Sequence, residues 1–219
     1  MCGIVGGVTE RNIVPILLEG LHRLEYRGYD SAGIAYRTEE NVSLVKSLGR
    51  VHDLEKKLDK KATSNIGIAH TRWATHGIPS EKNAHPHASN KNIYVAHNGI
   101  IENHEDLKSE LKSEGFKLYS QTDSEVIGHL IEFYKQRGMD FDSSVMKAIS
   151  RLKGAFALAV MDKNDPETLI GVRQSSPLVV GEGFDESFLA SDIMALSPVT
   201  NKFKFLEDGQ VVFLSKDKV

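Results

Sequence analysis

From Gly154 to the end of the chain, short apolar runs follow one another, separated by turn residues such as those at 163–166 and 207–209. Consecutive strands joined by tight turns pair in antiparallel fashion, because a parallel pair needs a crossover connection of roughly a dozen residues or more. The pattern therefore predicts antiparallel sheets in this part of the chain and disfavours a series of βαβ units.

The rest of the chain mixes strand-like runs with segments of helical spacing. In the first helical segment Leu17, Leu21 and Leu24 recur at short helical intervals, and Thr122 with Glu125 has the pattern of a capping box. We expect helices at 12–25, 103–114, 122–137 and 143–152. We expect strands at 4–8, 31–36, 42–48, 65–70, 93–97, 156–161, 169–173, 178–180, 187–190 and 211–214. This order favours an α+β fold, in which helices pack on largely antiparallel sheets.

Composition and charge indicate a soluble protein with a single core. A chain of 219 residues can bury a core without disulfides or metals, and we expect one domain over residues 1–219. The net charge of −3 gives no general attraction to nucleic acid or to anionic membranes. The longest apolar run, 155–161, is shorter than the roughly 18 residues of a membrane-spanning helix. The first residues do not have the pattern of a secretory signal, so we expect a cytoplasmic protein.

Cys2 is the only cysteine in the chain, so it cannot form an internal disulfide. Removal of Met1 would give Cys2 a free α-amine beside its thiol. An α-amine titrates near roughly 7.7 to 8.0 and a thiol near roughly 8.5, so the amine can accept the thiol proton at neutral pH. Cys2 is therefore a candidate nucleophile that carries its own base. The alternative is an ordinary buried cysteine near a terminus.

The apolar strand at 93–96 is followed directly by His97, Asn98 and Gly99. Asn-Gly after a strand is a strong signal for a hairpin turn. The same two residues also suit an oxyanion hole, because the Asn side-chain amide and the Gly backbone N–H are neutral donors that can point at one oxygen. The spacing alone leaves both interpretations open.

Residues 71–77 combine the only Trp of the chain with an Arg, two Thr hydroxyls and a Gly, a composition typical of a ligand-binding loop. The alternative is that Trp73 is buried for packing and Arg72 lies at the surface. Asp123 lies near the predicted start of a helix, where a carboxylate ordinarily interacts with the helix dipole.

Nine histidines raise the question of a metal site, with His85 and His87 the closest pair in sequence. The chain has no His-Glu-x-x-His spacing and no cysteine cluster, so we expect no metal. The glycine-rich start also lacks the spacing of a phosphate-binding loop, and we expect no cofactor.

Taken together, the motifs of the chain resemble those of the class II glutamine amidotransferases. The matching segments, in family order, are 2–6 (CGIVG), 24–33 (LEYRGYDSAG), 69–77 (AHTRWATHG), 84–87 (AHPH), 97–103 (HNGIIEN) and 122–125 (TDSE). The resemblance extends over essentially the whole chain. It implies an N-terminal-nucleophile fold, a four-layer α/β/β/α sandwich. It also implies hydrolysis of glutamine to glutamate and ammonia through a γ-glutamyl thioester.

The resemblance also implies a role for each matching residue. Cys2 would be the nucleophile, and Asn98 with the Gly99 N–H would form the oxyanion hole. Arg72 would bind the α-carboxylate of glutamine and Asp123 its α-ammonium group. The residues expected to line or close the pocket are Trp73, Thr75, His76 and His85, and those expected to position the thiol are Arg27 and Gly28.

Within the family, segments 25–31 and 72–77 are more similar to the glutamine:fructose-6-phosphate aminotransferases than to the phosphoribosyl-pyrophosphate amidotransferases. The resemblance to the glutamine:fructose-6-phosphate aminotransferases implies that the ammonia is used to convert fructose 6-phosphate to glucosamine 6-phosphate. The C-terminal sugar-isomerase portion that binds the sugar is expected to be absent from this chain, and the full-length enzyme is expected to be a homo-oligomer. The alternatives are the phosphoribosyl-pyrophosphate branch and an N-terminal-nucleophile hydrolase of another amide. A retained Met1 would turn the catalytic amine into an amide and silence the site.

Overall fold

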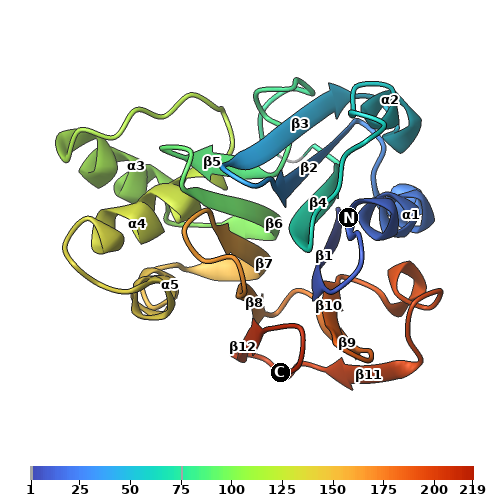
Figure 1. Ribbon diagram of the computed structural model, residues 1–219. Coiled ribbons are helices and arrows are strands. Elements are labelled where there is room, and N and C mark those ends of the chain that lie inside the picture. Colours follow the sequence, from blue (N-terminus) through green and yellow to red (C-terminus); the bar gives the residue numbers. More distant parts are fainter. Residues whose placement is uncertain (1, 75) are drawn as a thin grey trace.

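A computed structural model describes residues 2–74 and 76–219, which form two antiparallel sheets stacked face to face (Figure 1). Across the larger sheet the strands are β11 (Lys202–Phe205), β9 (Val179–Glu182), β10 (Glu186–Ala190), β1 (Gly3–Thr9), β4 (Ile66–Arg72), β2 (Ser31–Arg37) and β3 (Val42–Leu48). Across the smaller sheet they are β12 (Val211–Leu214), β8 (Leu169–Gln174), β7 (Gly154–Asp162), β6 (Ile93–Ile101) and β5 (His87–Ser89).

Helices cover both outer faces of this pair of sheets (Figure 1). The larger sheet carries α1 (Val14–Leu24), which continues into the 3-10 turn η1 (Glu25–Arg27), together with α2 (Val51–Glu55) and the 3-10 turn η2 (Ile193–Ala195). The smaller sheet carries α3 (His104–Ser113), α4 (Glu125–Lys135) and α5 (Phe141–Ile149). No helix in the described residues is both long and apolar enough to span a membrane. The expected α+β sandwich of two antiparallel sheets is confirmed.

The core follows the alternation of side chains along the inner strands. On β7, every second residue from Phe156 to Val160 packs against the helices, and every second residue from Ala157 to Met161 packs against the larger sheet. Both faces of the strand are therefore buried, which explains why its sequence is continuously apolar instead of alternating. Small residues at the interface between the sheets, such as Gly6, allow the layers to approach closely.

Most expected elements form, with shifted ends, but the capping box is wrong. The Glu125 carboxylate accepts the backbone N–H groups of Tyr119 (2.8 Å) and Ser120 (2.7 Å) instead of that of Thr122, and the helix begins at Glu125 after Ser124. Three short elements were not expected from the sequence: α2 with five residues, β5 with three and β11 with four. β11 is in addition an exposed edge strand.

Strand register brings distant parts of the sequence together at one end of the sandwich. In the larger sheet Gly3 pairs with Thr71, so Cys2 lies beside the end of β4. In the smaller sheet Tyr94 and Ala96 of β6 face the larger sheet, and Asn98 lies on that same face two residues further along. The candidate nucleophile and the candidate oxyanion donor therefore meet between the two sheets.

Candidate active site

The thiol of Cys2 is held against the chain that leaves β4. Its Sγ accepts the backbone N–H of Trp73 at 3.2 Å and lies 3.5 Å from the Trp73 carbonyl oxygen. Burial raises the pKa of the Cys2 thiol, and the Trp73 N–H only partly offsets this by favouring the thiolate. The thiol therefore keeps its proton at neutral pH unless a base is provided beside it.

The Asn98 side-chain amide has one orientation, fixed from both ends. Its Nδ2 donates to the Cys2 carbonyl oxygen at 3.0 Å, and its Oδ1 accepts from His70 Nε2 at 3.0 Å. His70 Nε2 also donates to the His97 carbonyl oxygen at 3.0 Å, and because a carbonyl can only accept, Nε2 must carry the hydrogen. The amide hydrogens of Asn98 therefore point toward the nucleophile.

The predicted hairpin alternative for Asn98 and Gly99 is wrong, because β6 continues through both residues to Ile101. Gly99 has a φ of 122°, and a Cβ at this position would collide with the carbonyl oxygen of Ala155 on the neighbouring strand. A glycine is required for the strand to pass here. This leaves the Asn98 amide on the cavity side, with Gly99 also in the cavity wall.

Arg72 is buried, although the packing alternative placed it at the surface. Its side chain is 3% exposed, and its guanidinium donates to the carbonyl oxygens of Gly77 (3.1 Å), Ile78 (3.4 Å) and His76. Trp73 is instead 48% exposed and makes an edge contact with Tyr29, with 5.5 Å between ring centres. The packing alternative for these two residues is therefore wrong.

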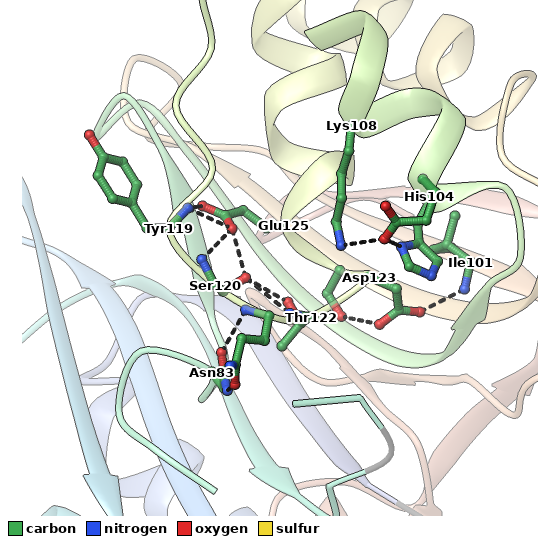
Figure 2. A network of polar contacts seen from close by, with 12 residues as sticks. Asn83, Ile101, His104, Lys108, Tyr119, Ser120, Thr122, Asp123 and Glu125 are labelled. Atoms are coloured by element: carbon green, nitrogen blue, oxygen red, sulfur yellow. Dashed lines mark hydrogen bonds and ion pairs between the residues drawn. The ribbon is translucent and has the colours of Figure 1, made fainter. Parts of the chain in front are cut away.

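Asp123 is also buried, at 3% exposure, and belongs to the segment that precedes α4. Its Oδ2 accepts the backbone N–H of Ile101 at 2.7 Å, and its Oδ1 lies 3.4 Å from the Ser124 hydroxyl (Figure 2). No ion pair to Asp123 or to Arg72 forms within residues 2–74 and 76–219. Among the described residues, both charges are thus held by dipoles and by no opposite charge.

Arg27 and Gly28 lie beside the nucleophile in different ways. Arg27 lines the cavity, and its guanidinium forms an ion pair with Asp192 at 2.8 Å rather than bonding to the thiol. Gly28 packs against the peptide that joins Arg72 to Trp73, where a Cβ would lie 2.7 Å from the Arg72 carbonyl carbon and 2.9 Å from Trp73 N. Gly28 therefore allows the close approach of the peptide whose N–H bonds to Sγ.

Four imidazoles form a buried histidine cluster: His70, His85, His87 and His97, of which His85 and His97 line the cavity. Burial lowers the pKa of each of them, to about 3 for His70 and about 4 for His97. Both ring nitrogens of His85 lack a hydrogen-bond partner among the described residues. In the described part of the chain no three His, Cys, Asp or Glu side chains are placed to hold a metal ion.

One cavity of about 260 Å³ is lined by most of the predicted site residues. The predicted residues in its wall are Cys2, Arg27, Arg72, Trp73, His76, His85, Asn98, Gly99 and Asp123. Gly28 lies behind the wall, and Thr75 lies outside the described residues. The wall residues not predicted as site residues are His97, Ile100, Thr122, Ser124, Ser176 and Pro177. The Ser-Ser-Pro sequence at 175–177 is a turn signal only, so nothing in it indicated a site.

Comparison with known proteins finds one matching family model and several similar sequences. A family model described as a glutamine amidotransferase domain matches residues 70–198. Over its whole length the chain is 49% identical to a glutamine–fructose-6-phosphate aminotransferase (isomerizing) of Escherichia coli K12 and 50% identical to that of Pseudomonas putida. The chain spans 36% of the length of each of these relatives.

Solved structures share the fold. A glutamine phosphoribosylpyrophosphate amidotransferase from B. subtilis, complexed with ADP and GMP, has a TM-score of 0.84 and 27% identity, covering 98% of this chain and 47% of that chain. A structure described as the allosteric regulatory enzyme of purine biosynthesis has the same TM-score at 28% identity, with the same coverage. Because the family model covers more than half of the residues, the chain belongs to the glutamine amidotransferase domain family.

Proposed function

We propose that this chain hydrolyses L-glutamine to glutamate and ammonia through Cys2. The observation that carries the proposal is that Arg72 and Asp123, two buried charges without an ion-pair partner in the described chain, line the same small cavity as the thiol. A buried charge without an opposite charge is unfavourable. An α-amino acid supplies both missing partners at once, its carboxylate to Arg72 and its ammonium to Asp123. Glutamine also carries, at its far end, the amide that a thiol can attack.

In the proposed reaction, Cys2 Sγ attacks the side-chain carbonyl carbon of glutamine while the thiol proton passes to the α-amine of Cys2. That amine is free only after removal of Met1, which lies outside the described residues. The raised pKa of the thiol makes this base necessary. Asn98 Nδ2 and the Gly99 N–H would donate to the oxyanion of the tetrahedral intermediate, in a site built from fixed dipoles.

The intermediate then collapses with cleavage of the C–N bond, and the protonated amine returns the proton to the leaving ammonia. A γ-glutamyl thioester remains on Sγ. Water attacks the thioester carbon, the C–S bond breaks, and glutamate and the free thiol are released. Trp73, Thr75, His76 and His85 are proposed to line or close the pocket around the substrate. Arg27 and Gly28 are proposed to position the thiol, Gly28 through the Trp73 peptide.

We further propose that the ammonia serves an enzyme that converts fructose 6-phosphate to glucosamine 6-phosphate. The identity of 49–50% to proteins named for that reaction supports this more than the 27% identity to a phosphoribosylpyrophosphate amidotransferase supports the other branch. A C-terminal isomerase portion would bind the sugar phosphate, and the chain alone would release ammonia without aminating a sugar. The cytoplasmic location and a homo-oligomeric full-length enzyme belong to the same proposal.

The proposal is tested by measuring glutamate and ammonia released from glutamine by the purified chain and its variants. Cys2→Ala should abolish release while the circular dichroism spectrum stays unchanged; retained activity would exclude Cys2 as the nucleophile. Arg72→Ala and Asp123→Ala should raise KM more than they lower kcat. If both lowered kcat with KM unchanged, these charges would not bind the substrate. Mass spectrometry checks the mature N-terminus and the labelling of Cys2 by a glutamine-mimicking electrophile.

A further inference from the structure

Asn83 lies outside the cavity wall, yet its side chain is almost fully buried, at 1% exposure. Its Nδ2 donates to the Ile78 carbonyl oxygen at 2.9 Å and to Gln121 Oε1 at 3.0 Å, and its Oδ1 accepts the backbone N–H of Gln121 at 2.9 Å. The Ile78 carbonyl can only accept and the Gln121 N–H can only donate, so the amide has one orientation. Both amide hydrogens are used, and the side chain joins two separate segments of the chain.

The two segments that Asn83 joins are those that carry the two buried charges. On one side, the Ile78 carbonyl oxygen that accepts from Asn83 also accepts from the Arg72 guanidinium at 3.4 Å, and Arg72 further donates to Gly77 at 3.1 Å. On the other side, Gln121 lies two residues before Asp123. A continuous polar path therefore runs from Arg72 through the Ile78 carbonyl and Asn83 to the segment of Asp123.

A second side chain, Glu125, also holds the segment 119–123 that leads to Asp123 (Figure 2). The Glu125 carboxylate accepts the N–H groups of Tyr119 and Ser120 and the Ser120 hydroxyl at 2.7 Å. Figure 2 shows Asn83 and Glu125 reaching this segment at neighbouring residues, with Asp123 pointing away toward Ile101. The turn that carries Asp123 is thus closed by the bonds of Glu125 to Tyr119 and Ser120, and its next residue, Gln121, is held by Asn83.

The side chain of Asn83 is also tightly packed against its neighbours. Gly77 has a φ of +78°, and a Cβ there would lie 2.7 Å from Asn83 Nδ2 and 2.9 Å from the Gln121 Cβ. Three parts of the chain, those of Gly77, Asn83 and Gln121, therefore touch at one point. A change in the Asn83 side chain is expected to move the segments on either side of it.

We propose that Asn83 is a positioning residue that sets the separation between Arg72 and Asp123, and so makes the site selective for ligands that carry an α-carboxylate and an α-ammonium group together. The inference rests on the proposed binding of glutamine. The two charged groups of an α-amino acid are attached to one carbon, so both can be bound only if their partners are held at a matching distance. Small misplacements of binding groups weaken such two-point recognition strongly.

The test is Asn83→Leu, which keeps a similar shape and removes all three hydrogen bonds. The expected result is a KM for glutamine raised tenfold or more with kcat within threefold, because Cys2 and Asn98 are untouched. The preference for glutamine over glutaramic acid, which lacks the ammonium group, and over 4-aminobutanamide, which lacks the carboxylate, should fall by a similar factor. A residue that only stabilised the fold would change the active fraction, and not this preference.

Asn12→Leu is the matched control. The Asn12 amide also bridges two segments, donating to the Ala62 carbonyl oxygen at 3.0 Å and accepting from Val14 and Ser64 at 3.1 Å, near the end of β1 remote from Cys2. Its substitution should lower thermal stability but leave KM and substrate preference unchanged. Equal KM changes in the two variants, or an unchanged KM and preference in Asn83→Leu, would overturn the proposal.

Two further measurements keep the result decisive. If Asn83→Leu does not fold, Gln121→Ala replaces it. Gln121 is exposed, and its loss removes only the contact to Oε1, so KM should rise two- to threefold; no rise would count against the proposal. Calorimetric binding of L-glutamine is measured in the Cys2→Ala background. A wild-type chain that does not hydrolyse glutamine would refute the proposed function, whereas binding that is unaffected by Asn83→Leu would refute the role of Asn83.

Discussion

Replacement of His70 by leucine should slow glutamine hydrolysis without weakening glutamine binding. His70 is fully buried and touches Asn98 through one hydrogen bond, from Nε2 to Oδ1 at 3.0 Å. Burial lowers the pKa of His70 to about 3, so the ring is neutral at any pH at which the enzyme would work. The carbonyl of His97 fixes the hydrogen on Nε2, and the donor to Asn98 is therefore the same throughout that range.

The size of the effect follows from what remains after the substitution. Losing an oxyanion-hole donor outright, as in Asn98→Ala, typically costs a factor of about 10² to 10³ in kcat. His70→Leu leaves Asn98 in place and leaves its bond to the Cys2 carbonyl oxygen at 3.0 Å, but removes one of the two bonds that orient the amide. A hydrogen bond contributes a net of about 1 kcal/mol, so we expect kcat to fall roughly fivefold to tenfold. The unpartnered Asn98 Oδ1 should lower the free energy of unfolding by about 1–3 kcal/mol.

The assay compares steady-state glutaminase kinetics of the wild type, His70→Leu and His70→Gln. The Gln amide can place an N–H near the position of Nε2, so it should recover kcat to within about threefold of the wild type. L-Glutamic γ-semialdehyde gives a second readout, because Sγ adds to its aldehyde carbon and the resulting oxygen occupies the oxyanion position. Its inhibition constant should rise about as much as kcat falls, while the affinity for glutamate stays constant. An unchanged kcat in His70→Leu, or no recovery in His70→Gln, would refute the reasoning.

Three other perturbations have expected outcomes. Gly28→Ala should lower kcat/KM at least tenfold and the free energy of unfolding by about 1–3 kcal/mol, because the added methyl group would lie within 3 Å of the Arg72–Trp73 peptide. Gly128→Ala is the control, because a Cβ there makes only ordinary contacts of 3.5 Å or more. Equal activity of the two variants would contradict this prediction. Imidazoles in the unfolded chain titrate at about 6.5, whereas burial lowers the pKa of the four in the histidine cluster. Their contribution to the free energy of unfolding should therefore be fully present above about pH 6.5. Below that pH it should fall by up to about 5 kcal/mol per pH unit, about 1.4 kcal/mol for each histidine. Urea unfolding from pH 7.5 to 5 checks this, and a flat profile below pH 6.5 would exclude it. Glu125→Gln should raise the KM for glutamine severalfold by loosening the segment of Asp123, measured in the same glutaminase assay, and an unchanged KM would show that this carboxylate does not position the segment.

The local features of the fold could be predicted from the sequence, because strands and helices follow from spacing. The continuous apolar run at 155–161 gave β7, and the periodic leucines near Leu17 gave α1. β9, β10 and β12 are equally short but have apolar runs that indicate strands, whereas the five residues of α2 make little more than one helical turn and the three of β5 include only one apolar residue. The capping box failed because the Glu125 carboxylate bonds to an earlier turn of the chain, a competition that a four-residue pattern cannot reveal.

The candidate site was predictable where a single residue brings its own chemistry, as with the Cys2 thiol and the Asn98 amide. The parts that depend on tertiary contacts were not. Arg72 could equally have been a surface residue by composition, and the carbonyls of His76, Gly77 and Ile78 that accept from its guanidinium become apparent only in the fold. Asn83 carries no signal of its own, since its partner Gln121 lies 38 residues away in the sequence.

The separation of Arg72 and Asp123 has an energetic consequence for how the site works. Two opposite charges in one cavity would attract each other strongly if they could meet, and a direct ion pair would fill the place of the substrate. Each is instead held by backbone groups, Arg72 by carbonyls and Asp123 by the Ile101 N–H. These contacts solvate the charges without neutralising them. Under the proposed binding mode, an α-amino acid would satisfy both charges at once, which would favour glutamine over simple amides before the thiol reacts.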